Sequence, residues 1–123
     1  MKPKAKYGEV ESPLVLVRMM IDFLPEDTWK NKNIKILDVG SGKGIFCREL
    51  TKLLHHNGFN NISSHLESIE LQEEHVEYCR KDPDNKALVK QGDFLTWEPE
   101  TDYDIVIGNP PFNSNGLKIV PTN

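Results

Sequence analysis

The sequence predicts an α/β fold with a doubly wound, mostly parallel sheet. Four short apolar runs that are typical of strands alternate with segments whose apolar residues recur at helical spacing. A glycine-rich turn follows the first of these runs and leads into the next helical segment. Alternation of strand and helix implies right-handed crossovers, which place successive strands parallel in one sheet.

Length and composition indicate one globular domain. The chain has 123 residues, of which 37% are hydrophobic and 28% charged, with a net charge of −4. No apolar stretch approaches the roughly 20 residues that span a bilayer, and no apolar segment follows the basic N-terminus. Cys47 and Cys79 lie far apart and the four histidines lack zinc spacing, so we expect no disulfide framework and no metal. These features favour a reducing, cytoplasmic compartment and no contact with a membrane.

The first helix is expected to begin at Pro13, which fits the first helical position, with Ser12 as its N-cap. Apolar residues then recur at helical spacing until Pro25 ends the run; they are Leu14, Val17, Met20, Ile21 and Leu24. A second helix carries Phe46, Leu50, Leu53 and Leu54 on one face, and Gly58 is its expected C-cap. The remaining elements are expected as strands at 34–39, 65–70, 87–90 and 103–108, with a third helix at 72–81.

The segment from Asp38 to Gly44 carries a glycine at every second position after Val39. Such a turn lets the backbone approach a ligand without Cβ clashes, and the helix N-terminus behind it suits an anionic group. A P-loop is excluded because Gly44, not Ser or Thr, follows Lys43. The spacing also departs from the dinucleotide fingerprint, and a purely structural turn remains the alternative.

Acidic residues follow the second and third strands. Glu70 ends the second strand, where a carboxylate can accept both hydroxyl protons of a ribose, with Glu67 as the fallback if the strand boundary shifts. The alternative is a solvated glutamate that starts a helix. Asp93 and Phe94 follow the third strand, where the acid can accept from an adenine amine and the ring can lie against a purine. An ordinary Gly-Asp turn is the alternative for this pair.

The loop Asn109-Pro110-Pro111-Phe112 follows the fourth strand. It offers a side-chain carbonyl, a backbone carbonyl and an aromatic ring on a backbone stiffened by two prolines. Such a loop suits a planar group that carries an NH2. The four motifs stand at the carboxyl ends of four successive strands, which places them around one crevice.

This order of motifs resembles the class I S-adenosylmethionine-dependent methyltransferases over most of 34–112. The resemblance implies their Rossmann-like fold and S-adenosyl-L-methionine as cofactor. The segment from Tyr7 to Pro13 is similar to the one that precedes the glycine motif in the gamma group of DNA adenine methyltransferases, although Glu11 stands where an aromatic is common. The implied cofactor-binding residues are Ser12, Pro13, Asp38, Gly40, Ser41, Gly42, Gly44, Glu70, Leu71, Asp93, Phe94 and Asn109.

The resemblance also implies methyl transfer to the N6 amino group of a flipped adenine in DNA. Asn109 and the Pro110 carbonyl would accept the two amine hydrogens, Pro111 would stiffen the loop, and Phe112 would stack on the base. A glutamine side chain or an RNA base amine is an alternative substrate, because similar loops serve those reactions. A non-catalytic cofactor-binding module is the third possibility.

The family's later strands and target-recognition region have no counterpart after Phe112. We therefore expect one incomplete domain over 1–123, made of an N-terminal segment and helix (1–33), a motif-bearing core (34–112) and a tail (113–123). The strand at 103–108 would then be a sheet edge. Residues 62–123 hold 12 acidic and 5 basic residues, so most phosphate contacts would come from a missing C-terminal half or a second subunit.

Overall fold

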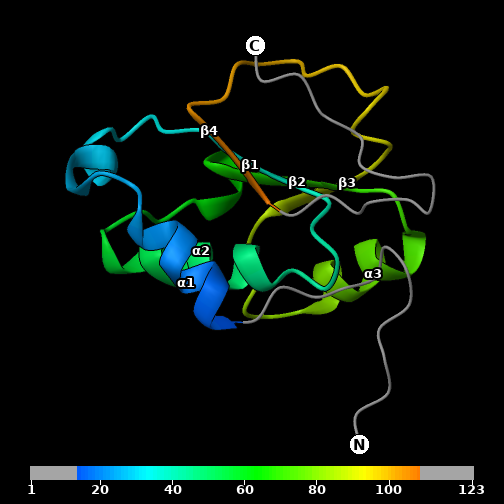
Figure 1. Cartoon of the computed structure of the whole chain (residues 1–123), viewed down its shortest axis with the longest axis horizontal. Helices are drawn as coiled ribbons and strands as arrows, with labels where there is room; N and C mark the ends of the chain where they lie inside the picture. Colours follow the sequence, from blue (N-terminus) through cyan, green and yellow to red (C-terminus); the bar gives the residue numbers. More distant parts are fainter. Residues whose placement is uncertain (1–13, 109–123) are drawn as a thin grey trace, which may run out of the picture.

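The computed structural model describes residues 14–108, and within them four strands form one parallel sheet (Figure 1). The strands are β1 (Ile36–Val39), β2 (Leu66–Glu70), β3 (Leu88–Gln91) and β4 (Ile105–Gly108). Their order across the sheet is β3-β2-β1-β4, and every neighbouring pair is parallel. The predicted parallel sheet is therefore confirmed, and its four carboxyl ends share one edge.

Each predicted helix is present with shifts of one or two residues at its ends. The helices are α1 (Leu14–Asp22), α2 (Ile45–His56) and α3 (Glu73–Lys81), with short 3-10 turns η1 (Glu26–Lys30) and η2 (Ile62–Ser64). Gly58 follows α2 with a φ of 86°, as expected for a glycine that ends a helix. The fourth strand begins at Ile105, two residues later than expected. At Asp104 the side chain, rather than the backbone, accepts a hydrogen bond from the Lys35 backbone N–H.

The main core lies between the sheet and its helices. All three α-helices lie on the same side of the sheet, which is the lower side in Figure 1. The apolar faces of α1 and α2 pack there against alternate residues of β1 and β2; the buried members are Val17, Ile21, Ile34, Ile36, Phe46, Cys47, Leu50, Leu54, Phe59, Ile62 and Leu66. Leu14 belongs to the predicted α1 stripe but is 40% exposed, because the sheet and α2 reach only the Val17 and Ile21 side.

The opposite face of the sheet is covered by the connection between β3 and β4. Leu37, Val39 and Ile69 are buried there beneath three partly buried aromatic residues of that connection, Phe94, Trp97 and Tyr103. The connection is anchored at its end, since the Tyr103 hydroxyl donates to Glu67 Oε1 at 3.1 Å. A doubly wound sheet carries helices on both faces, whereas the helices of residues 14–108 cover one face only.

Strand β4 lies at the end of the strand order, beside β1. Val106 in its middle is 57% exposed on the face away from the helices. Within the described residues, β4 therefore has the edge position that the sequence predicts.

No helix in residues 14–108 is long and apolar enough to cross a membrane.

Candidate functional site

The glycine turn joins β1 to α2 at the carboxyl edge of the sheet. Gly40, Gly42 and Gly44 have φ values of 64°, 54° and 85°, a conformation that other residues adopt only with strain. Gly44 is also confined, because a Cβ at this position would lie 2.7 Å from Asn85 Nδ2 and 2.9 Å from Cys79 Sγ. The predicted turn is thus a tight backbone feature that brings Ser41 and its neighbours to the start of α2.

Glu70 ties this turn to the next helix. Its Oε1 accepts from the Gly42 N–H at 2.8 Å, and its Oε2 accepts from the Gln72 N–H at 2.7 Å just before α3. The side chain is buried, so the alternative of a solvated glutamate is wrong. A carboxylate offers about four acceptor positions, which leaves capacity for further donors. Leu71, which follows it, is 57% exposed at the same edge.

Asp38 is the most deeply buried acid of the site. It is fully buried on β1, and its Oδ2 accepts a hydrogen bond from the Cys47 thiol at 3.2 Å. No donor in residues 14–108 reaches its other oxygen, Oδ1. Burial raises the pKa of Asp38 to about 7; the Cys47 hydrogen bond opposes this rise and the charge of Glu70 adds to it. Beneath the turn there is therefore a buried carboxyl group, one oxygen of which accepts no hydrogen bond from the described part of the chain.

Gly108 was missed by sequence reasoning as a site residue. It ends β4 opposite Val39, and its φ is 134°. A Cβ there would collide with the Val39 carbonyl and lie 2.7 Å from Asp38 Oδ1. The signal in the sequence was a glycine that closes an apolar strand directly before Asn109. The end of β4 therefore lies against the buried acid of β1.

The turn after β3 joins the same edge, because the Gly92 N–H donates to the Glu70 carbonyl at 3.0 Å. The exposed Asp93 accepts from the Leu95 N–H through Oδ1 at 3.0 Å, as in the ordinary turn considered as an alternative. Phe94 packs partly buried against the sheet face. The structure therefore brings Asp93 to the carboxyl edge, and part of the Phe94 ring packs against the core on the sheet face.

Six of the predicted site residues lie outside the described residues; they are Ser12, Pro13, Asn109, Pro110, Pro111 and Phe112. The other nine lie within the described residues, in the turns or strand ends at one edge of the sheet; they are Asp38, Gly40, Ser41, Gly42, Gly44, Glu70, Leu71, Asp93 and Phe94. Sequence reasoning missed two further contributors, the thiols of Cys47 and Cys79. Cys79 donates to the Gly42 carbonyl at 3.2 Å and so supports the turn from α3.

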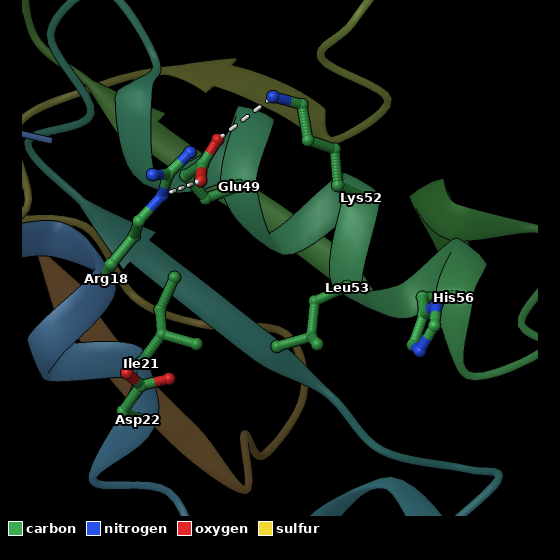
Figure 2. Close-up of a pocket in the computed structure, with 7 residues that line it drawn as sticks. All are labelled: Arg18, Ile21, Asp22, Glu49, Lys52, Leu53 and His56. Atoms are coloured by element: carbon green, nitrogen blue, oxygen red, sulfur yellow. Dashed lines mark hydrogen bonds and ion pairs between the residues drawn. The ribbon is translucent and has the colours of Figure 1, made fainter.

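A separate hollow lies between α1 and α2 (Figure 2). Three of its charged groups form ion pairs. Arg18 Nε of α1 lies 2.9 Å from one carboxylate oxygen of Glu49 on α2, and Lys52 Nζ of the same helix α2 lies 3.2 Å from the other. The other lining residues are Ile21, Asp22, Leu53 and His56. None of the predicted site residues lines this hollow, so the carboxyl edge of the sheet is the stronger candidate site.

Comparison with known proteins identifies a family and a fold. Residues 17–121 match the family described as methyltransferase small domain. The Type II methyltransferase M.HincII of Haemophilus influenzae is 29% identical over 109 residues, which cover 89% of this chain and 18% of that protein. The tRNA1(Val) (adenine(37)-N6)-methyltransferase of Aliivibrio fischeri is 32% identical over 87 residues, covering 67% of this chain and 34% of that protein. The chain thus spans a minor part of the length of these relatives.

Two solved structures share the fold. SMU.472, solved as a complex with SAH, aligns with a TM-score of 0.60 at 14% identity over 89% of this chain and 38% of that one. A TehB-like SAM-dependent methyltransferase from Corynebacterium glutamicum aligns with a TM-score of 0.53 at 23% identity over 84% of this chain and 44% of that one. The predicted Rossmann-like fold of class I methyltransferases is therefore confirmed.

Proposed function

The chain belongs to the methyltransferase small domain family, and from this premise we propose that it forms the cofactor-binding core of an adenine-N6 methyltransferase acting on nucleic acid. One observation carries the proposal. The glycine turn, the buried Asp38 and Glu70, and the end of β4 meet at one edge of the sheet, and Asn109-Pro110-Pro111-Phe112 follows that end directly. Parallel α/β sheets bind their ligands at this edge.

The described residues fit S-adenosyl-L-methionine. Glu70 would accept from the ribose hydroxyls, and the backbone of the glycine turn would approach the ligand closely. Oδ1 of Asp38, which no donor in residues 14–108 reaches, would accept from the ammonium group of the methionine moiety. Asp93 would accept from the adenine amine, with the exposed Leu71 against the purine. Bound there, the cofactor would supply a methyl group on a sulfonium, which is an activated donor.

Further assignments come from the resemblance. Gly40, Ser41, Gly42 and Gly44 would line the methionine end of the ligand, and Ser12 and Pro13 would close over it. Phe94 would border the adenine subsite, beside its place over the sheet core.

On the substrate side, Asn109 and the Pro110 carbonyl would accept the two hydrogens of the target amine. These bonds favour a pyramidal nitrogen, whose lone pair is otherwise conjugated with the ring and poorly nucleophilic. Pro111 would hold the loop stiff and Phe112 would stack on the flipped base. The chain's own contribution is thus orientation and electrostatic stabilisation of the amine during transfer.

DNA is the substrate we propose first, because the segment from Tyr7 to Pro13 is similar to DNA adenine methyltransferases and a relative is a Type II methyltransferase. RNA is the second candidate, since the tRNA relative is an adenine-N6 enzyme by name. We also propose that target recognition and most phosphate contacts come from polypeptide other than residues 1–123, because the acidic half offers few cations. The free thiols Cys47 and Cys79 fit a reducing, intracellular location.

The experiment has two stages. Calorimetry with S-adenosylhomocysteine should detect weak binding to the 123-residue chain, reduced by Glu70→Gln and left unchanged by the control Glu74→Gln on the exposed side of α3. Transfer of a radiolabelled methyl group is then measured on adenine-containing duplexes, tRNA and glutamine peptides. No binding by the wild-type chain would reject the proposal. Transfer to the peptide alone would favour the glutamine alternative, and binding without any transfer would favour a non-catalytic module.

A further inference from the structure

Cys47 is a fully buried thiol in the first turn of α2. Its Sγ lies 3.2 Å from Asp38 Oδ2 and donates a hydrogen bond to it across the boundary between helix and sheet. A thiol of this kind usually acts as a small apolar residue, and its position in the core gives it that role as well. The hydrogen bond to a buried acid adds a second possibility.

The two oxygens of Asp38 have different surroundings. Oδ2 is engaged by Cys47 from α2, whereas Oδ1 has no donor within residues 14–108. Oδ1 is the oxygen beside Gly108, as shown by the 2.7 Å distance from a Cβ built there. The thiol bond therefore fixes which oxygen is left for the end of β4, the strand that leads to Asn109.

We propose that Cys47 is a positioning residue: its thiol holds the Asp38 carboxylate so that Oδ1 stays available to the ammonium group of the bound cofactor. This inference rests on the proposed function. Cys47 itself would touch neither cofactor nor substrate.

The groups around Asp38 explain why the hydrogen bond from the neutral Cys47 thiol affects the pKa of this acid. Besides burial, the charge of Glu70 on β2 raises the pKa of Asp38. Burial raises the pKa of the Cys79 thiol on α3 to about 11, and the charges of Asp38 and Glu70 add to that rise. Burial and Asp38 also raise the pKa of the Cys47 thiol, so that it stays protonated and remains a donor. Loss of the thiol should raise the pKa of Asp38 above its value of about 7, because the bond to Cys47 is what opposes the effect of burial.

The experiment measures the titration of Asp38 directly, by carboxyl carbon NMR of the full 123-residue chain. Cys47→Ala and Cys47→Val remove the donor, Cys47→Ser keeps one, and Val76→Ala is a core control on α3 that lies in a different cluster. We expect the midpoint to rise by about one pH unit in Cys47→Ala and Cys47→Val, and to stay near the wild-type value in Cys47→Ser and Val76→Ala.

Affinity for S-adenosylhomocysteine is measured on the same proteins across pH. If binding needs ionised Asp38, a one-unit rise in its pKa lowers affinity about fivefold near pH 7, and the deficit shrinks as pH rises. Comparing each variant with wild type at each pH cancels the titration of the ligand's own amine. A merely structural role would lower stability in Cys47→Ala and Val76→Ala alike, with no change in the Asp38 midpoint.

Two results would overturn the inference and are distinguishable. Binding of S-adenosylhomocysteine with an unchanged Asp38 midpoint in Cys47→Ala and Cys47→Val would reject the positioning role alone. A shifted midpoint without ligand binding by the wild-type chain would reject the proposed function, and with it the role of Cys47 toward a cofactor. The Cys47→Val and Cys47→Ser proteins keep the test valid if Cys47→Ala does not fold.

Discussion

Replacement of Gly108 by alanine adds one methyl group, and we expect it to lower the free energy of unfolding strongly. Gly108 has a φ of 134°, and a Cβ would collide with the Val39 carbonyl and lie 2.9 Å from the Val39 nitrogen, both backbone atoms of the neighbouring strand. Backbone in such a region costs a non-glycine residue about 1–3 kcal/mol. Pressing the new methyl group against the Val39 backbone adds about 1–3 kcal/mol to this cost. We therefore expect Gly108→Ala to lower the free energy of unfolding by about 2–6 kcal/mol.

Gly58→Ala is the matched control. Gly58 also has a positive φ, of 86°, but a Cβ there would meet no atom within 4 Å among the described residues. Its cost should be the conformational part alone, about 1–2 kcal/mol. Urea unfolding followed by circular dichroism measures both free energies. Equal losses in the two variants, within about 0.5 kcal/mol, would refute the reasoning that β4 presses against β1 at Gly108.

Three further outcomes are expected. Glu70→Gln should weaken S-adenosylhomocysteine binding at least about tenfold and lower the free energy of unfolding by about 1–2 kcal/mol. The reason is that the amide oxygen can accept from one of the two backbone N–H groups at a time. Calorimetry measures the affinity and thermal melting the stability, with Glu74→Gln as control for both. Tyr103→Phe should cost about 0.5–1.5 kcal/mol in urea unfolding by removing the hydrogen bond to Glu67, and an unchanged stability would contradict that anchor. Asp38→Asn should remove a pH dependence. The pKa of Asp38 is about 7 in the folded chain and lies above its ordinary value of 3.8. The contribution of this raised pKa to stability is therefore complete below pH 3.8 and is lost as the pH rises through 7. Melting temperatures of wild type should therefore fall between about pH 4 and pH 8 more than those of Asp38→Asn, and parallel curves would disprove the assignment.

Local patterns predicted the elements and the edge of the sheet at which they meet. Helical spacing identified α1 through Val17 and Ile21, because both residues reach the core on one side. The motifs after β1, β2 and β3 lie at one edge because the strands are parallel, a property that follows from their alternation with helices. The acid at the end of β2 was found because it stands at a strand terminus.

What the sequence did not reveal depends on contacts between distant residues. Cys47 and Asp38 are nine residues apart, and only the packing of α2 on β1 makes them hydrogen-bond partners. The constraint on Gly108 comes from Val39, which lies on another strand. Phe94 was predicted beside a ligand, yet part of its surface is used to cover the sheet, because the described connection after β3 supplies no helix for that face.

The acids of this fold differ in how their charge is neutralised. Away from the carboxyl edge, buried or half-buried acids have cationic partners: Glu67 pairs with Lys90 Nζ at 2.8 Å, and Glu49 pairs with Arg18 and Lys52. At the carboxyl edge, the described residues give Asp38 only a thiol and satisfy Glu70 with two backbone N–H groups. The ring of His75 is the basic group near Glu70, with Nδ1 at 3.7 Å, beyond hydrogen-bond distance. These donors of the described residues are neutral, so they stabilise the two adjacent buried carboxylates without cancelling their charge. A ligand that carries an ammonium and a sulfonium would supply the missing positive charge, which is the physical reason to expect the cofactor at this edge of the sheet.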